Sequence, residues 1–91
     1  MENRKNPYGK IQTAADLGAA IHKKRKEIRA DQAKIAGLSG VGIRFLSELE
    51  RGKPTAELGK TLQVLNRLGL EIWIVPRGGR PGEEREGETS A

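Results

Sequence analysis

The side chains that could carry covalent or acid–base chemistry are few in this sequence of 91 residues. There is no cysteine, which excludes disulfides, zinc–thiolate sites and thiol catalysis. The one histidine, His22, cannot form a histidine metal cluster or a Ser-His-Asp triad; we expect it at the surface, with a phosphate contact as the alternative. Glu48 and Glu50 point to different sides of a helix and form no acid–base pair. The sequence therefore predicts no enzyme, no metal site and no cofactor.

Three glycines lie close together but do not form a phosphate-binding loop. Gly37, Gly40 and Gly42 run in the wrong order for a GxGxxG motif, and no strand precedes them. We expect them in turns. Gly40 lies where a positive φ would end one helix and redirect the chain into the next.

The chemistry that remains is recognition of a polyanion by basic side chains. Residues 1–54 hold 12 basic and 6 acidic side chains, whereas residues 55–91 hold 5 and 6. A basic half on a small domain favours nucleic acid as the partner, with a merely solubilising surface as the alternative. No apolar run of about 18 residues and no secretory leader is present, so we expect a cytoplasmic protein without a membrane segment.

Four helices are expected to position the basic side chains. Apolar spacing and capping residues place them over residues 14–29, 32–38, 43–51 and 56–68, with Thr13, Asp31 and Thr55 as three of the caps. The apolar faces expected for the first and fourth helices are Leu17, Ala20, Ile21 and Ile28, and Leu58, Leu62 and Leu65.

The third helix is expected to have two different faces. Phe45, Leu46 and Leu49 lie on one arc and would anchor the helix in a core, with Phe45 at the core or its edge. The opposite arc carries Ile43, Arg44, Ser47, Glu48 and Arg51. A short helix, a tight turn with glycine and a second helix with a polar outer face form the pattern of a DNA-binding helix-turn-helix.

Two segments carry a resemblance to a known family. The segment DQAKIAGLSGVGIRFLSELERGKPT, residues 31–55, resembles the XRE/Cro-repressor type of helix-turn-helix proteins. The segment ELGKTLQVLNRLGLEI, residues 57–72, is similar to the HipB-like antitoxins within that family. The resemblance extends over about residues 14–75. It implies a mainly α, lambda-repressor-like domain of four or five helices, with a C-terminal β-strand that pairs across a homodimer.

The resemblance also implies a set of DNA-binding residues. They are Gln32, Gly42, Ile43, Arg44, Ser47, Arg51 and Lys53. Gln32 would contact a phosphate, and Arg44 is the candidate for a bidentate pair with guanine. Arg51 and Lys53 would contact phosphates. Relatives usually carry Ser, Thr or Lys at the position of Gly42, so one side-chain contact is missing here.

Some polar residues are expected to be structural. Arg25 and Glu50 match a pair that forms an internal salt bridge in the family, with a phosphate contact as the alternative for Arg25. Glu48 is expected as a solvated edge residue, with acceptance of a hydrogen bond from cytosine N4 as the alternative.

The spacing of apolar residues changes after Gly69 from a helical pattern to one typical of a strand. Residues 70–76 are β-branched and aromatic and predict a strand that has no partner in its own chain. We expect it to pair with a second copy through Leu70, Ile72, Trp73 and Ile74. The predicted organisation is an N-terminal arm (1–13), a helix-turn-helix domain (14–69), a dimerisation strand (70–76) and a disordered tail (77–91).

As a HipB-like protein, the chain would bind an inverted repeat in double-stranded operator DNA and repress its own operon. It would also act as the antitoxin of a type II toxin–antitoxin pair, neutralising a HipA-like serine/threonine kinase toxin in the bacterial cytoplasm, in association with the nucleoid. The alternatives are a stand-alone phage-type or XRE-family regulator without a toxin, and an interaction adaptor that uses the scaffold without reading DNA.

Overall fold

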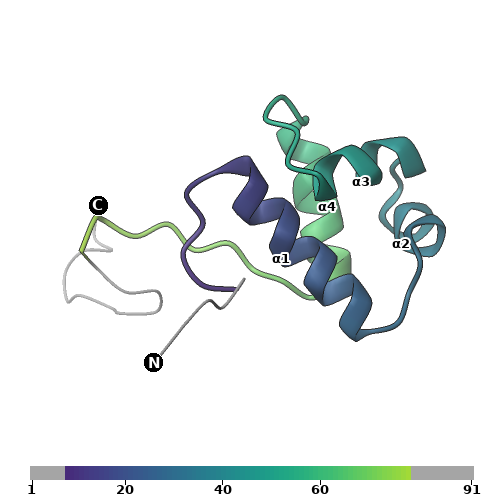
Figure 1. The fold of residues 1–91 in the computed structure, drawn as a ribbon, viewed down its shortest axis with the longest axis horizontal. Helices are drawn as coiled ribbons and strands as arrows, with labels where there is room; N and C mark the ends of the chain where they lie inside the picture. Colours follow the sequence, from purple (N-terminus) through teal and green to yellow (C-terminus); the bar gives the residue numbers. More distant parts are fainter. Residues whose placement is uncertain (1–7, 79–91) are drawn as a thin grey trace, which may run out of the picture.

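Four helices account for the regular structure, which a computed structural model describes for residues 8–78. They are α1 (Ala14–Glu27), α2 (Gln32–Ser39), α3 (Ile43–Glu50) and α4 (Leu58–Leu68) (Figure 1). Neither a fifth helix nor a strand occurs within residues 8–78. The mainly α, four-helix fold expected from the sequence is confirmed. Most of the predicted arm and tail, residues 1–7 and 79–91, lies outside the described residues.

Local capping explains where the first two helices begin and end. The backbone N–H of Asp16 donates to Thr13 Oγ1 (3.0 Å), and Asp16 Oδ2 accepts from the backbone N–H of Thr13 (3.1 Å), which completes a capping box for α1. Asp31 Oδ1 accepts from the backbone N–H of Lys34 (2.8 Å) and caps α2. Gly40 ends α2 with a φ of 75°, as its position predicts.

The start of the fourth helix differs from the prediction. α4 follows Glu57, which forms no side-chain cap, and not Thr55. The backbone N–H of Ala56 donates to the carbonyl of Lys53 (3.4 Å), so the chain makes a further turn before the helix begins.

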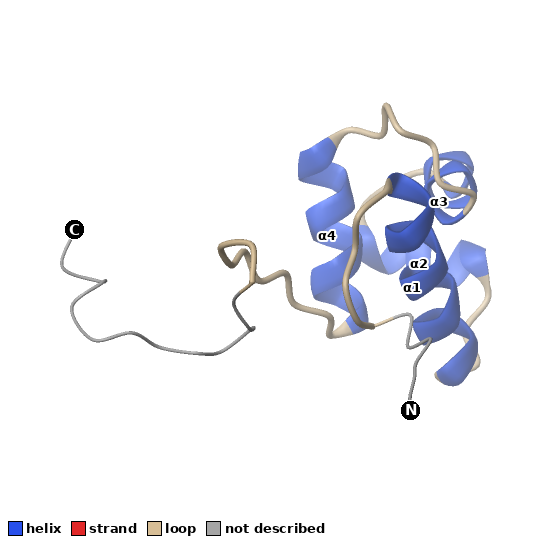
Figure 2. Cartoon of the chain, turned by 60° about the vertical axis from the view of Figure 1, so that its left-hand side comes forward, coloured by secondary structure: helices blue, strands red, loops and turns tan. Residues whose placement is uncertain are grey.

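The four helices pack against one another (Figure 2), and one hydrophobic core joins them. Its most deeply buried large side chains are Ile21 of α1, Leu46 of α3 and Val64 of α4, all of which are fully buried. Ile35, Ala36, Leu49, Leu65 and Leu68 complete it. Phe45 lies at the edge of this core, as expected. Because Leu46 and Leu49 fix the inner face of α3, its opposite face is held toward solvent.

Three apolar residues expected in the core are exposed. Ile28 follows the last turn of α1, where its side chain no longer faces the other helices. Leu58 and Leu62 are exposed because α4 turns a neighbouring face inward, on which Thr61, Val64, Leu65 and Leu68 are buried. Leu58, with 66% of its surface accessible, and Leu62 therefore form an apolar stripe on the outside of α4.

The predicted strand over residues 70–76 is not formed within the single chain. The backbone N–H of Leu70 donates to the carbonyl of Leu65 (2.9 Å) and closes the end of α4. Beyond it the chain leaves the helices and runs outward, with Trp73 and Ile74 exposed (Figure 1). A strand requires hydrogen bonds to a neighbouring backbone, and the described residues 8–78 supply none at this segment. Pairing across a homodimer stays a prediction.

The helices α1 and α3 approach each other closely at Gly18. A Cβ atom added there would lie 2.5 Å from the carbonyl oxygen of Leu49 and 2.6 Å from that of Glu50. Glycine is therefore required for the packing of α1 against the end of α3, a role that the sequence analysis did not assign to it.

Candidate nucleic-acid interface

The outer face of α3 begins with exposed side chains. Ile43 and Arg44 follow the N-cap Gly42, and the Arg44 side chain is 89% exposed. Gly42 makes no side-chain capping bond, because glycine has no side chain that could accept one. The geometry presents the first turn of a core-anchored helix to solvent, which is the arrangement that reading a DNA major groove requires.

Charged side chains joined by ion pairs extend along this face. Glu48 Oε2 lies 3.4 Å from Arg44 Nε, and Glu48 Oε1 lies 3.0 Å from Lys53 Nζ. The hydrogen bond from Lys53 is the main reason why the pKa of Glu48 is lowered. Glu48 thus forms ion pairs with Arg44 and Lys53 and is not a freely solvated residue. Its negative charge is offset by two cations on the same surface, which keeps the face suitable for a polyanion.

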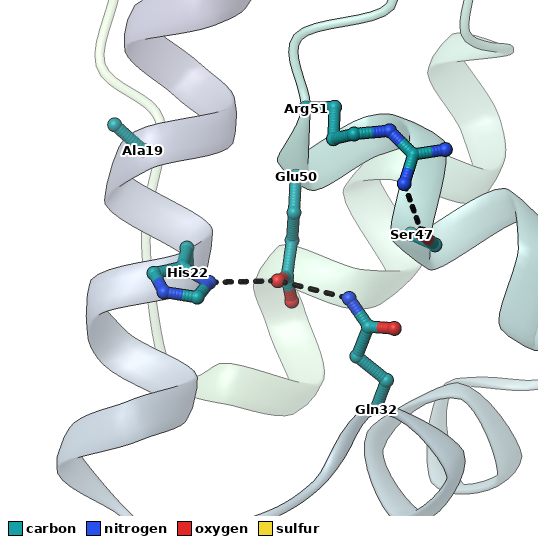
Figure 3. A pocket seen from close by; sticks show the side chains of 6 residues that line it. All are labelled: Ala19, His22, Gln32, Ser47, Glu50 and Arg51. Carbon is teal, nitrogen blue, oxygen red and sulfur yellow. Dashed lines mark hydrogen bonds and ion pairs between the residues drawn. The ribbon is translucent and has the colours of Figure 1, made fainter.

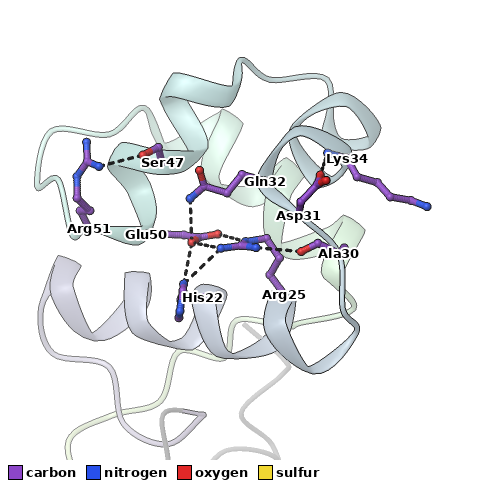
Figure 4. Close-up of polar contacts among 9 residues, drawn as sticks. All are labelled: His22, Arg25, Ala30, Asp31, Gln32, Lys34, Ser47, Glu50 and Arg51. Atoms are coloured by element: carbon purple, nitrogen blue, oxygen red, sulfur yellow. Dashed lines mark hydrogen bonds and ion pairs between the residues drawn. The ribbon is translucent and has the colours of Figure 1, made fainter.

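Behind this face, the expected Arg25–Glu50 pair is present as a bidentate ion pair (Figure 4). Arg25 Nε donates to Glu50 Oε2 (2.6 Å) and Arg25 Nη2 to Glu50 Oε1 (2.9 Å). Arg25 Nη1 donates to the carbonyl of Ala30 (2.9 Å). The two side chains are only 8% and 4% exposed. Arg25 is therefore engaged with protein atoms on all three nitrogens.

Glu50 joins three helices through further contacts. Its Oε1 lies 2.9 Å from His22 Nδ1 on α1 and accepts from Gln32 Nε2 on α2 (3.1 Å). Burial by itself raises the pKa of Glu50, but the hydrogen bonds from Arg25, His22 and Gln32 together outweigh burial and lower the pKa from 4.5 to about 2. The carboxylate stays ionised at all physiological pH values.

This lowered pKa predicts a loss of stability in acid. A carboxyl whose pKa is lower in the folded state stabilises the fold above its unfolded pKa, and the stabilisation is lost as the pH falls toward the folded pKa. Between pH 5 and pH 2 we expect the free energy of unfolding to fall less steeply for Glu50→Gln than for the wild type, in urea titrations followed by circular dichroism. Asp16, Glu27 and Glu48 also have lowered pKa values, but they are common to both proteins. Equal slopes would contradict the prediction.

The remaining predicted residues lie around a pocket of about 430 Å³ (Figure 3). Its lining comes from α1, α2, α3 and the residue after α3, and consists of Ala19, His22, Gln32, Ser47, Glu50 and Arg51. Arg51 Nη1 donates to Ser47 Oγ (3.0 Å) at the rim. The predicted DNA-binding residues thus form two groups, with Gly42, Ile43, Arg44 and Lys53 on the outer face and Gln32, Ser47 and Arg51 at the pocket.

His22 was expected at the surface, and its side chain is 52% exposed; its contact with Glu50 and its place in the pocket lining were not predicted. His22 precedes Arg25 by three residues, and this spacing places both side chains on one side of α1. That spacing is the feature of the sequence from which a position of His22 beside the Arg25–Glu50 pair could have been predicted. Within residues 8–78, no three His, Asp or Glu side chains converge in a way that could hold a metal ion. No helix of that part is both long and apolar enough to cross a bilayer.

Two short helices joined at Gly40, the second anchored by its inner face, define a helix-turn-helix domain. No family model matches the sequence. The chain is 49% identical over 77 residues to the uncharacterised HTH-type transcriptional regulator y4mF of Sinorhizobium fredii, covering 85% of this chain and 96% of that protein. The chain therefore belongs to the HTH-type transcriptional regulators.

Solved structures share the fold of this chain. The HipB–O4 20mer complex matches with a TM-score of 0.70 and 20% identity, covering 75% of this chain and 96% of that chain. The HipA–HipB–O2–O3 complex contains a chain that matches with the same TM-score, identity and coverage. The chain therefore has the fold of these HipB structures, as the resemblance implied.

Proposed function

We propose that the protein is a dimeric repressor that inserts α3 into the major groove of an inverted-repeat operator, regulates its own operon, and acts as the antitoxin of a HipA-like kinase. The observation that carries DNA reading is Arg44, exposed on the first turn of a helix whose other face is fixed in the core. A guanidinium held this way can pair with guanine O6 and N7.

Arg44→Ala is expected to weaken operator binding by about 1–3 kcal/mol, or about 5–150-fold, while binding to random duplex changes far less. The reason is that a base contact is lost, whereas the phosphate contacts of the other basic residues remain. Titrations of both duplexes by fluorescence anisotropy at one salt concentration measure the difference. Arg77→Ala, which removes the same charge outside the helices, is the matched control. Equal losses on the two duplexes would make Arg44 a phosphate contact only.

Dimerisation is proposed from the exposed apolar side chains of α4 and the segment after it. They are Leu58, Leu62, Ile72, Trp73 and Ile74. A second copy would cover this surface and supply the backbone partner that residues 70–76 need to form a strand. The two recognition helices would then lie about 34 Å apart, in successive major grooves of the inverted repeat.

Trp73→Glu is expected to shift the protein from dimer to monomer, because it places a charge in an interface that must exclude water. Sedimentation velocity at micromolar concentration measures the mass. Leu38→Glu introduces the same charge at an exposed leucine outside this surface and should leave the dimer intact. An unchanged mass for Trp73→Glu would remove the strand-pairing model.

The antitoxin role is supported by the similarity of residues 57–72 to HipB-like sequences and by the HipB-like fold, which occurs in a complex that also contains HipA. A stand-alone regulator is the second candidate, because the name of the relative y4mF describes a transcriptional regulator and mentions no toxin. A pull-down of tagged protein from its native cells at moderate salt separates them. A kinase-sized partner together with DNA upstream of its own operon supports the antitoxin. Recovery of DNA alone supports the regulator.

A further inference from the structure

The pocket between α1, α2 and α3 contains a histidine nitrogen with no protein partner. The His22 side chain is 52% exposed. Both of its polar contacts are made by Nδ1, to Glu50 Oε1 at 2.9 Å and to Arg25 Nη2 at 3.4 Å (Figure 4). Within residues 8–78, Nε2 has no hydrogen-bond partner. This atom is therefore available to a ligand in the pocket.

The contact with Glu50 determines what Nε2 can do. The Glu50 carboxylate is ionised and accepts hydrogen bonds only, so the proton of the neutral imidazole lies on Nδ1. Neutral His22 then presents a lone pair at Nε2, which repels an anionic oxygen. Protonated His22 presents an N–H and a positive charge at the same place, both of which favour an anion.

The other pocket groups also favour an anion. The Glu50 charge is matched by Arg25 in the bidentate pair, and Gln32 Nε2 uses one of its two hydrogens on Glu50, which leaves the second free. Arg51 uses Nη1 on Ser47 and retains further donors. The pocket thus has unused donors and no unmatched negative charge.

The charged groups that line the pocket, contact His22 or interact electrostatically with Arg25 come from α1, from the start of α2 and from the end of α3. Arg25 lies on α1, Asp31 caps the start of α2, and Glu50 and Arg51 lie at the end of α3. No residue of α4 lines the pocket. Arg25 and Glu50 offset each other, and Asp31 Oδ1 is bonded to the backbone N–H of Lys34. Among these four charged residues, Arg51 is the cation that forms no ion pair with a carboxylate of residues 8–78.

The pocket is placed beside the DNA-reading face. Ser47 and Arg51 follow Arg44 by about one and two helical turns along the same side of the helix. When the first turn of α3 enters a major groove, groups that flank it on α1, on the start of α2 and at the end of α3 face the sugar–phosphate backbone. A backbone phosphate is the anion that this position would meet.

We propose that the pocket binds one phosphate of the DNA backbone and that His22 is a ligand of it through Nε2–H, so that operator binding takes up a proton. The proposal rests on the DNA-binding function proposed above. Gln32 and Arg51 complete the phosphate site. Because protonation of His22 supplies both the N–H and the positive charge at Nε2, binding is then tighter at lower pH.

The test is a titration of a fixed operator duplex, selected with the wild-type protein from a random library, between pH 5.5 and 8.5 and at several salt concentrations. For the wild type we expect affinity to rise up to about tenfold per unit fall in pH, the limit for uptake of one proton. At pH 5.5 the slope of log affinity against log salt should be steeper than at pH 8.5 by about one ion.

Two variants isolate His22, which is the one histidine of the chain. His22→Asn retains a donor near the position of Nδ1 for Glu50 and removes Nε2, so both the excess pH dependence and the excess salt slope should disappear. His22→Lys carries a permanent charge and should bind at pH 8.5 about as tightly as the wild type binds at pH 5.5. Thermal unfolding of each variant shows that it is folded under the binding conditions.

The outcomes separate this proposal from the function it rests on. A wild-type protein that selects no duplex at any pH overturns the DNA-binding function itself. A wild type that binds specifically, with pH and salt dependences equal to those of His22→Asn, overturns the phosphate site alone. Loss of pH dependence in His22→Asn together with tight binding of His22→Lys at high pH supports it.

Discussion

Arg25→Met is expected to lower the free energy of unfolding by about 3–5 kcal/mol. The substitution keeps a long apolar side chain but leaves the Glu50 carboxylate, 4% exposed, without its main cation. It also removes the hydrogen bond to the carbonyl of Ala30. Small domains have total stabilities of roughly 5–15 kcal/mol, so this loss would remove a substantial part of the folding free energy. Urea unfolding followed by circular dichroism measures the change.

The controls for this prediction use the same chemistry at other places. Arg44→Met removes an exposed pair to Glu48 and should change stability by less than about 0.5 kcal/mol. The double variant Arg25→Met/Glu50→Leu removes both charges and should recover much of the loss, because no unpaired carboxylate stays buried. A loss below about 1 kcal/mol for Arg25→Met would show that Glu50 finds other partners in the folded state.

Gly18→Ala is expected to destabilise the domain by about 1–3 kcal/mol, although alanine normally favours a helix. The added methyl group would meet two backbone oxygens, of Leu49 and Glu50, at 2.5 and 2.6 Å. Backbone atoms at the end of α3 cannot rotate away as a side chain can, so α1 and α3 must separate. The shift would also disturb Glu50 and hence the pocket.

Gly37→Ala provides the matched comparison. Gly37 lies within α2, and an added Cβ there meets nothing within 4 Å. This variant should gain up to about 1 kcal/mol from helix propensity alone. The two substitutions are chemically identical and are predicted to have opposite signs, which thermal and urea unfolding can decide. A gain in stability for Gly18→Ala would contradict the close approach of α1 and α3.

The Glu50 network links stability to the proposed DNA-binding surface. Glu50 receives hydrogen bonds from α1 and α2 while it ends α3, so one carboxylate fixes how the three helices meet. Gln32 is held by that bond at the start of α2, where its side chain lines the pocket (Figure 3). Substitutions at Glu50 are therefore expected to affect folding and DNA binding together, whereas Arg44→Ala should affect binding alone.

Features that depend on residues a few positions apart could be predicted from the sequence. The capping box at Thr13, the cap at Asp31 and the left-handed Gly40 are local, because each bond or dihedral angle involves residues within one turn. The two faces of α3 are also local, since a period of 3.6 residues separates Leu46 and Leu49 from the outward residues. Resemblance to a family added the Arg25–Glu50 pair, which no local rule predicts.

Features that depend on neighbours distant in the sequence could be read only from the packing of the helices. Two adjacent faces of α4 are apolar enough to be buried, and contact with α1 and α2 selected the one with Val64 and Leu68 over the one with Leu58. Residues 70–76 have strand-like side chains, but a strand forms only where another backbone offers hydrogen bonds. Gly18 and His22 acquire their roles from residues 28 or more positions away at the end of α3, so only the packing of α1 against α3 could reveal them.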